Sequence, residues 1–167
     1  TEQTLDRLTN RNVPASQWQA FQSDAAKLTI TNSSFERFAV AGAALGRSDN
    51  IHHGFDILEN IMLQQDVRFV TSGGEEFQFH KSQGIGNGGN QVNLGVDSVN
   101  YYTSFADPRY KHNSWGEFMA TPVGAAKNFD TFASGRASMI FGYARDMSAI
   151  EDVIEERKTS RLFHVDE

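Results

Sequence analysis

The segment Phe129–Ile150 (FDTFASGRASMIFGYARDMSAI) constrains the fold most, because it joins a helical pattern, an apolar run and a polar turn. Apolar residues recur three and four positions after Phe129, which predicts the buried stripe of a short helix, and Gly135 predicts its end. The run Ala137–Phe141 is nearly continuous in apolar residues, as in a strand buried on both faces of a parallel sheet. Apolar residues at near-helical spacing begin again at Met147, so a second helix is expected there. Helix, strand and helix in this order indicate an α/β fold.

Polar side chains lie in the turn between this strand and the second helix. Gly142 ends the apolar run, and Tyr143, Arg145 and Asp146 follow it. In open α/β sheets, ligands bind outside the carboxyl ends of strands, next to helix N-termini. Tyrosine offers a flat stacking face, arginine a fork of donors and aspartate an acceptor. We therefore expect Tyr143, Arg145 and Asp146 to contact a polyhydroxylated ligand.

The rest of the chain also alternates between helical and strand patterns, which extends the α/β prediction to residues 1–167 as a single domain. At this length the chain can bury one sizeable core. The elements expected in chain order are a helix over 1–9, a helix with Trp18, Phe21, Ala25 and Leu28 on one face, a strand at Phe38 and Val40, a loop over 46–50, a helix through Phe55, Leu58, Ile61 and Met62, a hairpin from 68–70 and 75–80, a turn over 84–89, and a helix through Val92, Val96, Val99 and Tyr102.

Several segments together resemble a known family. They occur in the same order as in the second lobe of an extracellular solute-binding protein, of the family that delivers sugars to ABC importers. The segments are Pro14–Leu28 (PASQWQAFQSDAAKL), Ala41–Gln65 (a strand, a loop and a helix), Phe105-Ala-Asp-Pro108, Ser114-Trp115 with Met119, and Phe132-Ala-Ser-Gly135-Arg-Ala-Ser-Met139.

This resemblance implies a fold. It implies one lobe of a type II fold like that of the periplasmic binding proteins, in which helices flank a small mixed sheet. A complete member of the family has two lobes, so residues 1–167 are expected to be an isolated second lobe. A natural single-lobe protein is the alternative.

The resemblance also implies a function. Two lobes would close around a solute by hinge motion and pass it to the membrane permease of an ABC importer. The second lobe would contribute Tyr143, Arg145 and Asp146, the loop Arg47–Asn50 would form the opposite wall, and His53 would be a further contact. The implied solute is a sugar or oligosaccharide, bound without catalysis and without a cofactor. The implied location is periplasmic or extracellular, with or without a membrane anchor on the full-length protein.

Two other function classes stay open at this point. One is a protein-interaction module, a single lobe that has lost transport and holds a partner protein in its former cleft; a predominantly apolar cleft would favour it. The other is a small-molecule enzyme on the same fold, since a fold does not fix a function.

Composition excludes some classes of function. The formal net charge is −6, and the lysines and arginines form no cluster, so we expect no nucleic-acid partner. The chain has no cysteine, which excludes disulfides and thiolate metal sites but does not decide the compartment. No apolar run approaches the roughly eighteen residues that a membrane span needs.

Two motifs suggest other chemistry. The segment Gly84-Ile-Gly86-Asn-Gly88-Gly89 matches the G-x-G-x-x-G pattern of dinucleotide sites, but the residues before it are polar and alternating, so we expect a surface turn. His52 and His53 lie near Asp49 and Asp56. Because adjacent residues on a helix point about 100° apart, we expect no metal site there.

The loop 108–118 carries two large aromatic residues, Tyr110 and Trp115. Each is expected to anchor the loop to the core rather than to stack on a sugar. No G-x-S-x-G elbow marks a catalytic triad, which agrees with a binding protein.

Overall fold

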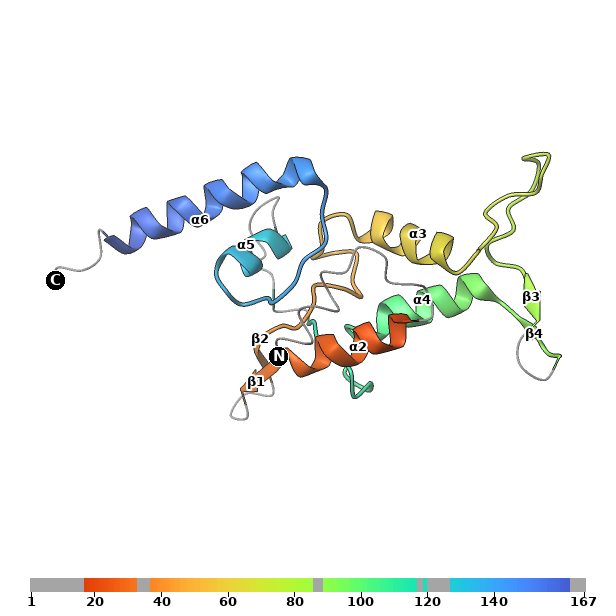
Figure 1. The fold of residues 1–167 in the computed structure, drawn as a ribbon, viewed down its shortest axis with the longest axis horizontal. Helices are drawn as coiled ribbons and strands as arrows, with labels where there is room; N and C mark the ends of the chain where they lie inside the picture. Colours follow the sequence, from red (N-terminus) through yellow and green to blue (C-terminus); the bar gives the residue numbers. More distant parts are fainter. Residues whose placement is uncertain (1–16, 33–36, 86–88, 117–118, 120–126, 163–167) are drawn as a thin grey trace.

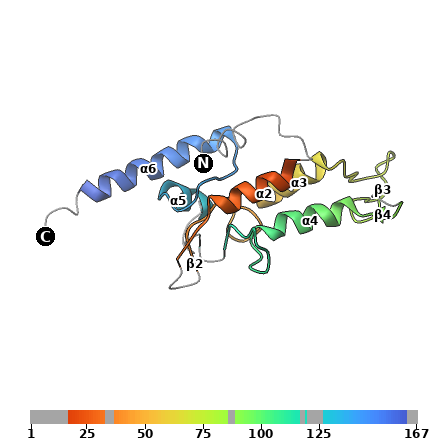
Figure 2. The same ribbon diagram turned by 60° about the horizontal axis from the view of Figure 1, so that its bottom comes forward.

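The computed structural model describes residues 17–32, 37–85, 89–116, 119 and 127–162. The helices α2 (Trp18–Lys27), α3 (Gly54–Gln64) and α4 (Leu94–Ser104) gather around the middle of the molecule (Figure 1). A long helix, α6 (Met147–Leu162), extends to one side of this group, and an arm formed by residues 67–85 and 89–92 extends to the other. In the turned view, α6 and the arm again lie at opposite ends of the molecule (Figure 2).

The helices expected through Trp18 and Phe55 are present as α2 and α3. The helix expected through Val92 and Tyr102 is present as α4, but it begins at Leu94, and Val92 lies in a strand instead. A further helix, α5 (Lys127–Ala133), precedes α6, and a single 3-10 turn, η3 (Ala144–Asp146), leads directly into it. Gly135 has a φ of +73°, the left-handed conformation expected just after a helix. The helix expected over 1–9 lies outside the described residues. Within the described part of the chain, no helix is both long and apolar enough to cross a lipid bilayer.

The strands are short and pair in two antiparallel ladders. Strand β1 (Ile30–Asn32) pairs with β2 (Arg37–Val40), and β3 (Gly84–Ile85) pairs with β4 (Gln91–Val92). The first ladder has an irregular register after Ile30, which faces Val40. With its helices and small sheets the protein is a mixed α/β protein, as expected from the sequence.

The strand predicted over Ala137–Phe141 is largely wrong. Only Ala137 forms a bridge, a parallel one with Ala41. Ser138 N–H donates to Ala41 O and Met139 O accepts from Ala44 N–H, so the segment starts to pair with the chain beyond β2. The chain beyond β2 then turns away from this segment, because Leu45 N–H donates to Ala43 O in a tight turn. The pairing therefore ends after Met139.

The core lies where the segments before α3 meet the segments after α4. Its largest fully buried side chains are Trp115, Phe105, Leu45 and Ile61. The prediction that Trp115 anchors its loop to the core is confirmed. The same prediction is wrong for Tyr110, which is 49% exposed.

The arm confirms the predicted hairpin. Val70 bridges Phe77 in antiparallel orientation, and Gln78 N–H donates to Phe69 O. The segment 84–89 connects β3 to β4, with residues 86–88 outside the described residues. A strand rather than a helix follows the glycines, so the context of a dinucleotide-binding motif is missing.

Candidate functional site

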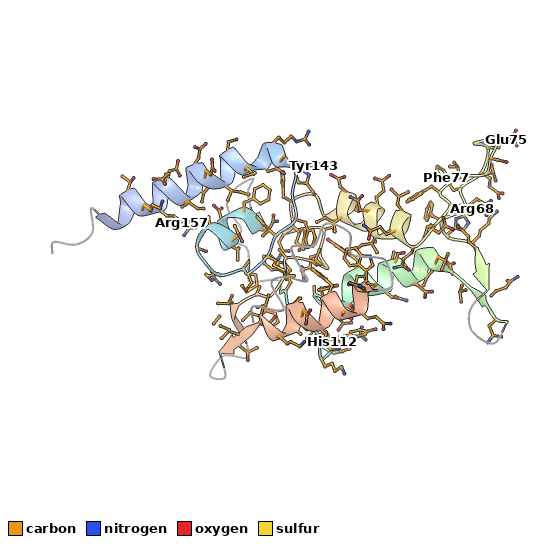
Figure 3. The ribbon with its side chains drawn as sticks, viewed as in Figure 1. Arg68, Glu75, Phe77, His112, Tyr143 and Arg157 are labelled. Carbon is orange, nitrogen blue, oxygen red and sulfur yellow. The ribbon has the colours of Figure 1, made fainter. Side chains whose placement is uncertain are left out.

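The predicted turn and the start of α3 come together in the structure. Tyr143 lies where the chain enters α6, beside the N-terminal end of α3 (Figure 3). Tyr143 Oη donates to Asp56 Oδ2 at 3.0 Å, and its ring meets the His53 ring at 4.7 Å between centroids. Asp146 Oδ2 lies 3.0 Å from His53 Nε2. Tyr143, Asp146 and His53, three residues predicted as ligand contacts, therefore form one cluster.

The turn is held in shape by its own hydrogen bonds. Tyr143 N–H donates to Asp146 Oδ2 at 2.6 Å, and Asp146 N–H donates back to Tyr143 O at 2.9 Å. The hydrogen bond from Tyr143 N–H lowers the pKa of the Asp146 carboxyl, which favours its charged form. The hydrogen bond to Asp56 raises the pKa of Tyr143, which keeps its hydroxyl protonated.

Arg145 stacks on Tyr143 instead of pointing into a cavity. Its guanidinium carbon lies 4.6 Å from the centre of the Tyr143 ring, within the range of a cation–π interaction. Tyr143 itself is 45% exposed, although Arg145 and His53 both contact its ring.

A pocket of about 240 Å³ adjoins the cluster. Three elements form its walls: the start of α2, one face of α3, and the segment before η3. The lining residues are Trp18, His53, Asp56, Ile57, Asn60, Ile61, Gln64, Phe141, Gly142 and Tyr143. The pocket thus combines aromatic rings with carboxylate, amide and imidazole groups.

Sequence reasoning missed most of this lining. Asp56, Asn60 and Gln64 recur every four residues along α3 and so share one face of the helix. That polar stripe was a usable signal. Trp18 reaches the pocket from α2, where its Nε1–H donates to Gln64 Oε1 at 2.6 Å, a contact across 46 positions that no local pattern predicts.

Two predicted contacts have other roles. Asn50 is buried, accepts a hydrogen bond from Trp115 Nε1 at 2.9 Å and donates one to Gly116 O at 3.2 Å. Arg47 forms a paired contact with Asp49 through its Nε and Nη2 atoms, at 2.8 and 2.7 Å. Neither residue is among those that line this pocket, and the role of the loop Arg47–Asn50 as the opposite wall of a ligand cleft stays a prediction.

The two adjacent histidines do not lie on a helix. Both belong to the turn before α3, and His53 has a left-handed backbone with φ +59°. Their ring centroids are only 4.1 Å apart, so the expectation that they point apart is wrong. His52, His53 and Asp146 each offer one ligand atom, and these atoms lie within 4.8 Å of one another.

Comparison with known proteins adds no assignment to this geometry. No protein-family model, no curated protein and no solved structure matches the chain.

Proposed function

We propose that this chain is the carbohydrate-binding lobe of a solute-binding protein that serves an ABC importer, and that it does no chemistry on its ligand. The pocket beside Tyr143 is the observation that carries the proposal. It combines three aromatic side chains, Trp18, Phe141 and Tyr143, with the polar stripe on α3. The family resemblance of the sequence motifs points in the same direction.

The chemistry of the pocket suits a sugar. A pyranose has C–H groups on its faces and hydroxyls at its edge, so it pairs with both apolar rings and polar groups. The rings of Trp18, Phe141 and Tyr143 supply apolar faces. Asp56 offers an acceptor, and Asn60 offers both donor and acceptor groups.

The size of the pocket suits one half of a site. Pockets that enclose a drug-sized ligand have volumes of about 300–1,000 Å³. The volume of about 240 Å³ here is below that range. We propose that a second lobe completes the site by closing over the ligand, and that the single lobe binds weakly because it lacks those contacts. This role places the protein in the periplasm or outside the cell, with a membrane permease as its partner.

Isothermal calorimetry with mono- and oligosaccharides tests the proposal, on this chain and on a longer parent chain where one exists. The central variant is Tyr143→Ala, with Tyr110→Ala as its control, because Tyr110 is similarly exposed but does not line the pocket. We expect Tyr143→Ala to weaken binding at least tenfold, which corresponds to about 1.4 kcal/mol. Tyr143→Phe keeps the aromatic ring, so it should lose less saccharide affinity than Tyr143→Ala.

Three results bear on this proposal. Saccharide recovered unchanged after incubation agrees with binding without catalysis. Equal losses in Tyr143→Ala and Tyr110→Ala place the ligand elsewhere. A parent chain that binds no saccharide contradicts the proposal.

A protein-interaction module is the second candidate. Several large apolar side chains on α3 and the arm are strongly exposed, among them Phe55 at 74% and Phe77 at 66%. Exposed apolar groups of this kind favour a protein partner. Failure of every saccharide in the calorimetry, combined with loss of a partner on Phe55→Ser or Phe77→Ser, would support this function instead.

A further inference from the structure

We propose that His52, His53 and Asp146 bind a divalent transition-metal ion, with Zn²⁺ as the first candidate. The site lies next to the pocket but does not depend on a carbohydrate ligand. It also replaces the expectation of no metal site, which assumed that the histidines lie on a helix.

The positions of the ligand atoms support this site. In a tetrahedral zinc site the ligand atoms lie about 3.3 Å apart, as metal–ligand distances of about 2.0–2.1 Å require. His53 Nε2 and Asp146 Oδ2 are already 3.0 Å apart. The third ligand atom comes from His52, and all three atoms lie within 4.8 Å of one another. The His52 ring lies against the rings of His53 and Phe129, so a small shift of this side chain has to bring its ligand atom to the ion.

The charges around His53 favour a cation. Asp146 Oδ2 lies 3.0 Å from His53 Nε2, and Asp56 Oδ2 lies 3.3 Å from His53 Nδ1. A neutral imidazole has one N–H, so it can donate to only one of these carboxylates. At the other ring nitrogen, an unprotonated nitrogen then faces a carboxylate oxygen, and both of these atoms are acceptors. A second proton on the ring or a metal ion removes this conflict, because either one supplies positive charge between them. A metal ion between Nε2 and Asp146 satisfies both sides of the ring, because Nδ1–H then donates to Asp56.

The surrounding hydrogen bonds match those of metal sites. A histidine ligand usually donates its other ring N–H to a carboxylate, which orients the ring. Asp56 is in that position for His53, and Tyr143 Oη in turn donates to Asp56. Asp146 is oriented by Tyr143 N–H, and the backbone N–H of His52 donates to Asn128 Oδ1 at 2.7 Å. The ligands are therefore supported from three segments of the chain.

The types of ligand select the class of metal. Imidazole nitrogens with one carboxylate suit Zn²⁺, Ni²⁺ or Cu²⁺, whereas Mg²⁺ and Ca²⁺ prefer oxygen ligands alone. Three protein ligands leave a fourth position for water or a ligand group. We name Zn²⁺ first because it accepts this ligand set in tetrahedral geometry.

Calorimetric titration of the tag-free protein with Zn²⁺ tests the site, together with the visible absorption of the Co²⁺ form. We expect one ion per chain and the strong d–d bands of a tetrahedral Co²⁺ site. His52→Ala, His53→Ala and Asp146→Asn should each weaken binding at least tenfold. Asp56→Asn, which changes only the supporting contact, should weaken it by about 10–100-fold.

The other histidines provide matched controls. The chain has five, and His80→Ala and His112→Ala each remove one outside the proposed site. Figure 3 shows His112 on the opposite side of the molecule from Tyr143. We expect Zn²⁺ binding by these controls to equal that of the unchanged protein. Circular dichroism of each variant checks that the fold is intact.

Either of two results overturns the proposal. One is an unchanged protein that takes up no Zn²⁺ or Co²⁺; His53 is then paired with both carboxylates by protons alone. The other is an equal loss of binding in the site variants and the histidine controls, which indicates adventitious binding by surface histidines.

Discussion

Replacing Asn50 by alanine should destabilise the fold. Asn50 is 7% exposed and Trp115 is fully buried, and the Trp115 Nε1–H donates to Asn50 Oδ1 at 2.9 Å. In Asn50→Ala this indole N–H loses its acceptor inside the core, which costs about 1–3 kcal/mol. The hydrogen bond from Asn50 to Gly116 O is lost as well, at about 1 kcal/mol. The expected loss in the free energy of unfolding is therefore about 2–4 kcal/mol.

Chemical and thermal unfolding measure this loss. For a chain of this size, about 3 kcal/mol corresponds to a fall in Tm of about 6–12 °C. A double-mutant cycle with Trp115→Phe isolates the hydrogen bond, because phenylalanine has no N–H to leave unpaired. We expect a coupling energy of about 1–2 kcal/mol. Asn50→Ala with a stability within about 0.5 kcal/mol of the unchanged protein would refute the reasoning, since that is the range of neutral surface changes.

Two further predictions concern the start of α3 and alkaline pH. An alanine Cβ at Gly54 would lie 2.9 Å from Arg47 O and 3.0 Å from Tyr102 Oη, so Gly54→Ala should cost about 1–3 kcal/mol in urea unfolding. Gly73→Ala, where the nearest atom is 3.6 Å away, should cost much less, and equal costs would contradict the crowding argument. Burial raises the pKa of Tyr102 to about 12 from a usual value of 10.0. Its contribution to stability should therefore be complete below pH 10 and lost as the pH rises towards 12, as Tm against pH reports, and Tyr102→Phe should flatten this loss.

The sequence predicted where helices lie better than which faces they bury. The helix through Val96 and Val99 exists as α4, but both valines are exposed, at 49% and 38%. Its buried positions are Gly95, Ser98, Tyr102 and Ser104. Three of these residues are small, and at Gly95 the backbone of Phe79 approaches so closely that a Cβ would lie 1.8 Å from Phe79 O. Periodicity reports apolar residues, whereas burial here also depends on how closely another segment approaches.

The difference between the apolar pattern of the sequence and the burial of residues is also seen in α3 and in the candidate site. Phe55 belongs to the apolar pattern that predicted this helix, yet it is 74% exposed while Ile57 is buried. The turn at Tyr143 and Asp146 could be predicted because a break after an apolar run is local information. The contact of Asp146 with His53 spans 93 positions, and the backbone turn that holds His53 off the helix has no simple sequence signal.

The two proposals share His53 but can be tested separately. Asp146 belongs to the metal cluster and does not line the pocket, whereas Asn60 lines the pocket and is not part of the cluster. Asp146→Asn should therefore remove Zn²⁺ binding while weakening saccharide binding less than Tyr143→Ala does, because Asp146 also holds the turn that carries Tyr143. Asn60→Ala should weaken saccharide binding and leave Zn²⁺ binding unchanged. His53→Ala should affect both, since its ring takes part in both sites. If Asp146→Asn and Asn60→Ala each lost both activities, the common cause would be a displaced α3, and neither ligand could be assigned to the residues that face it.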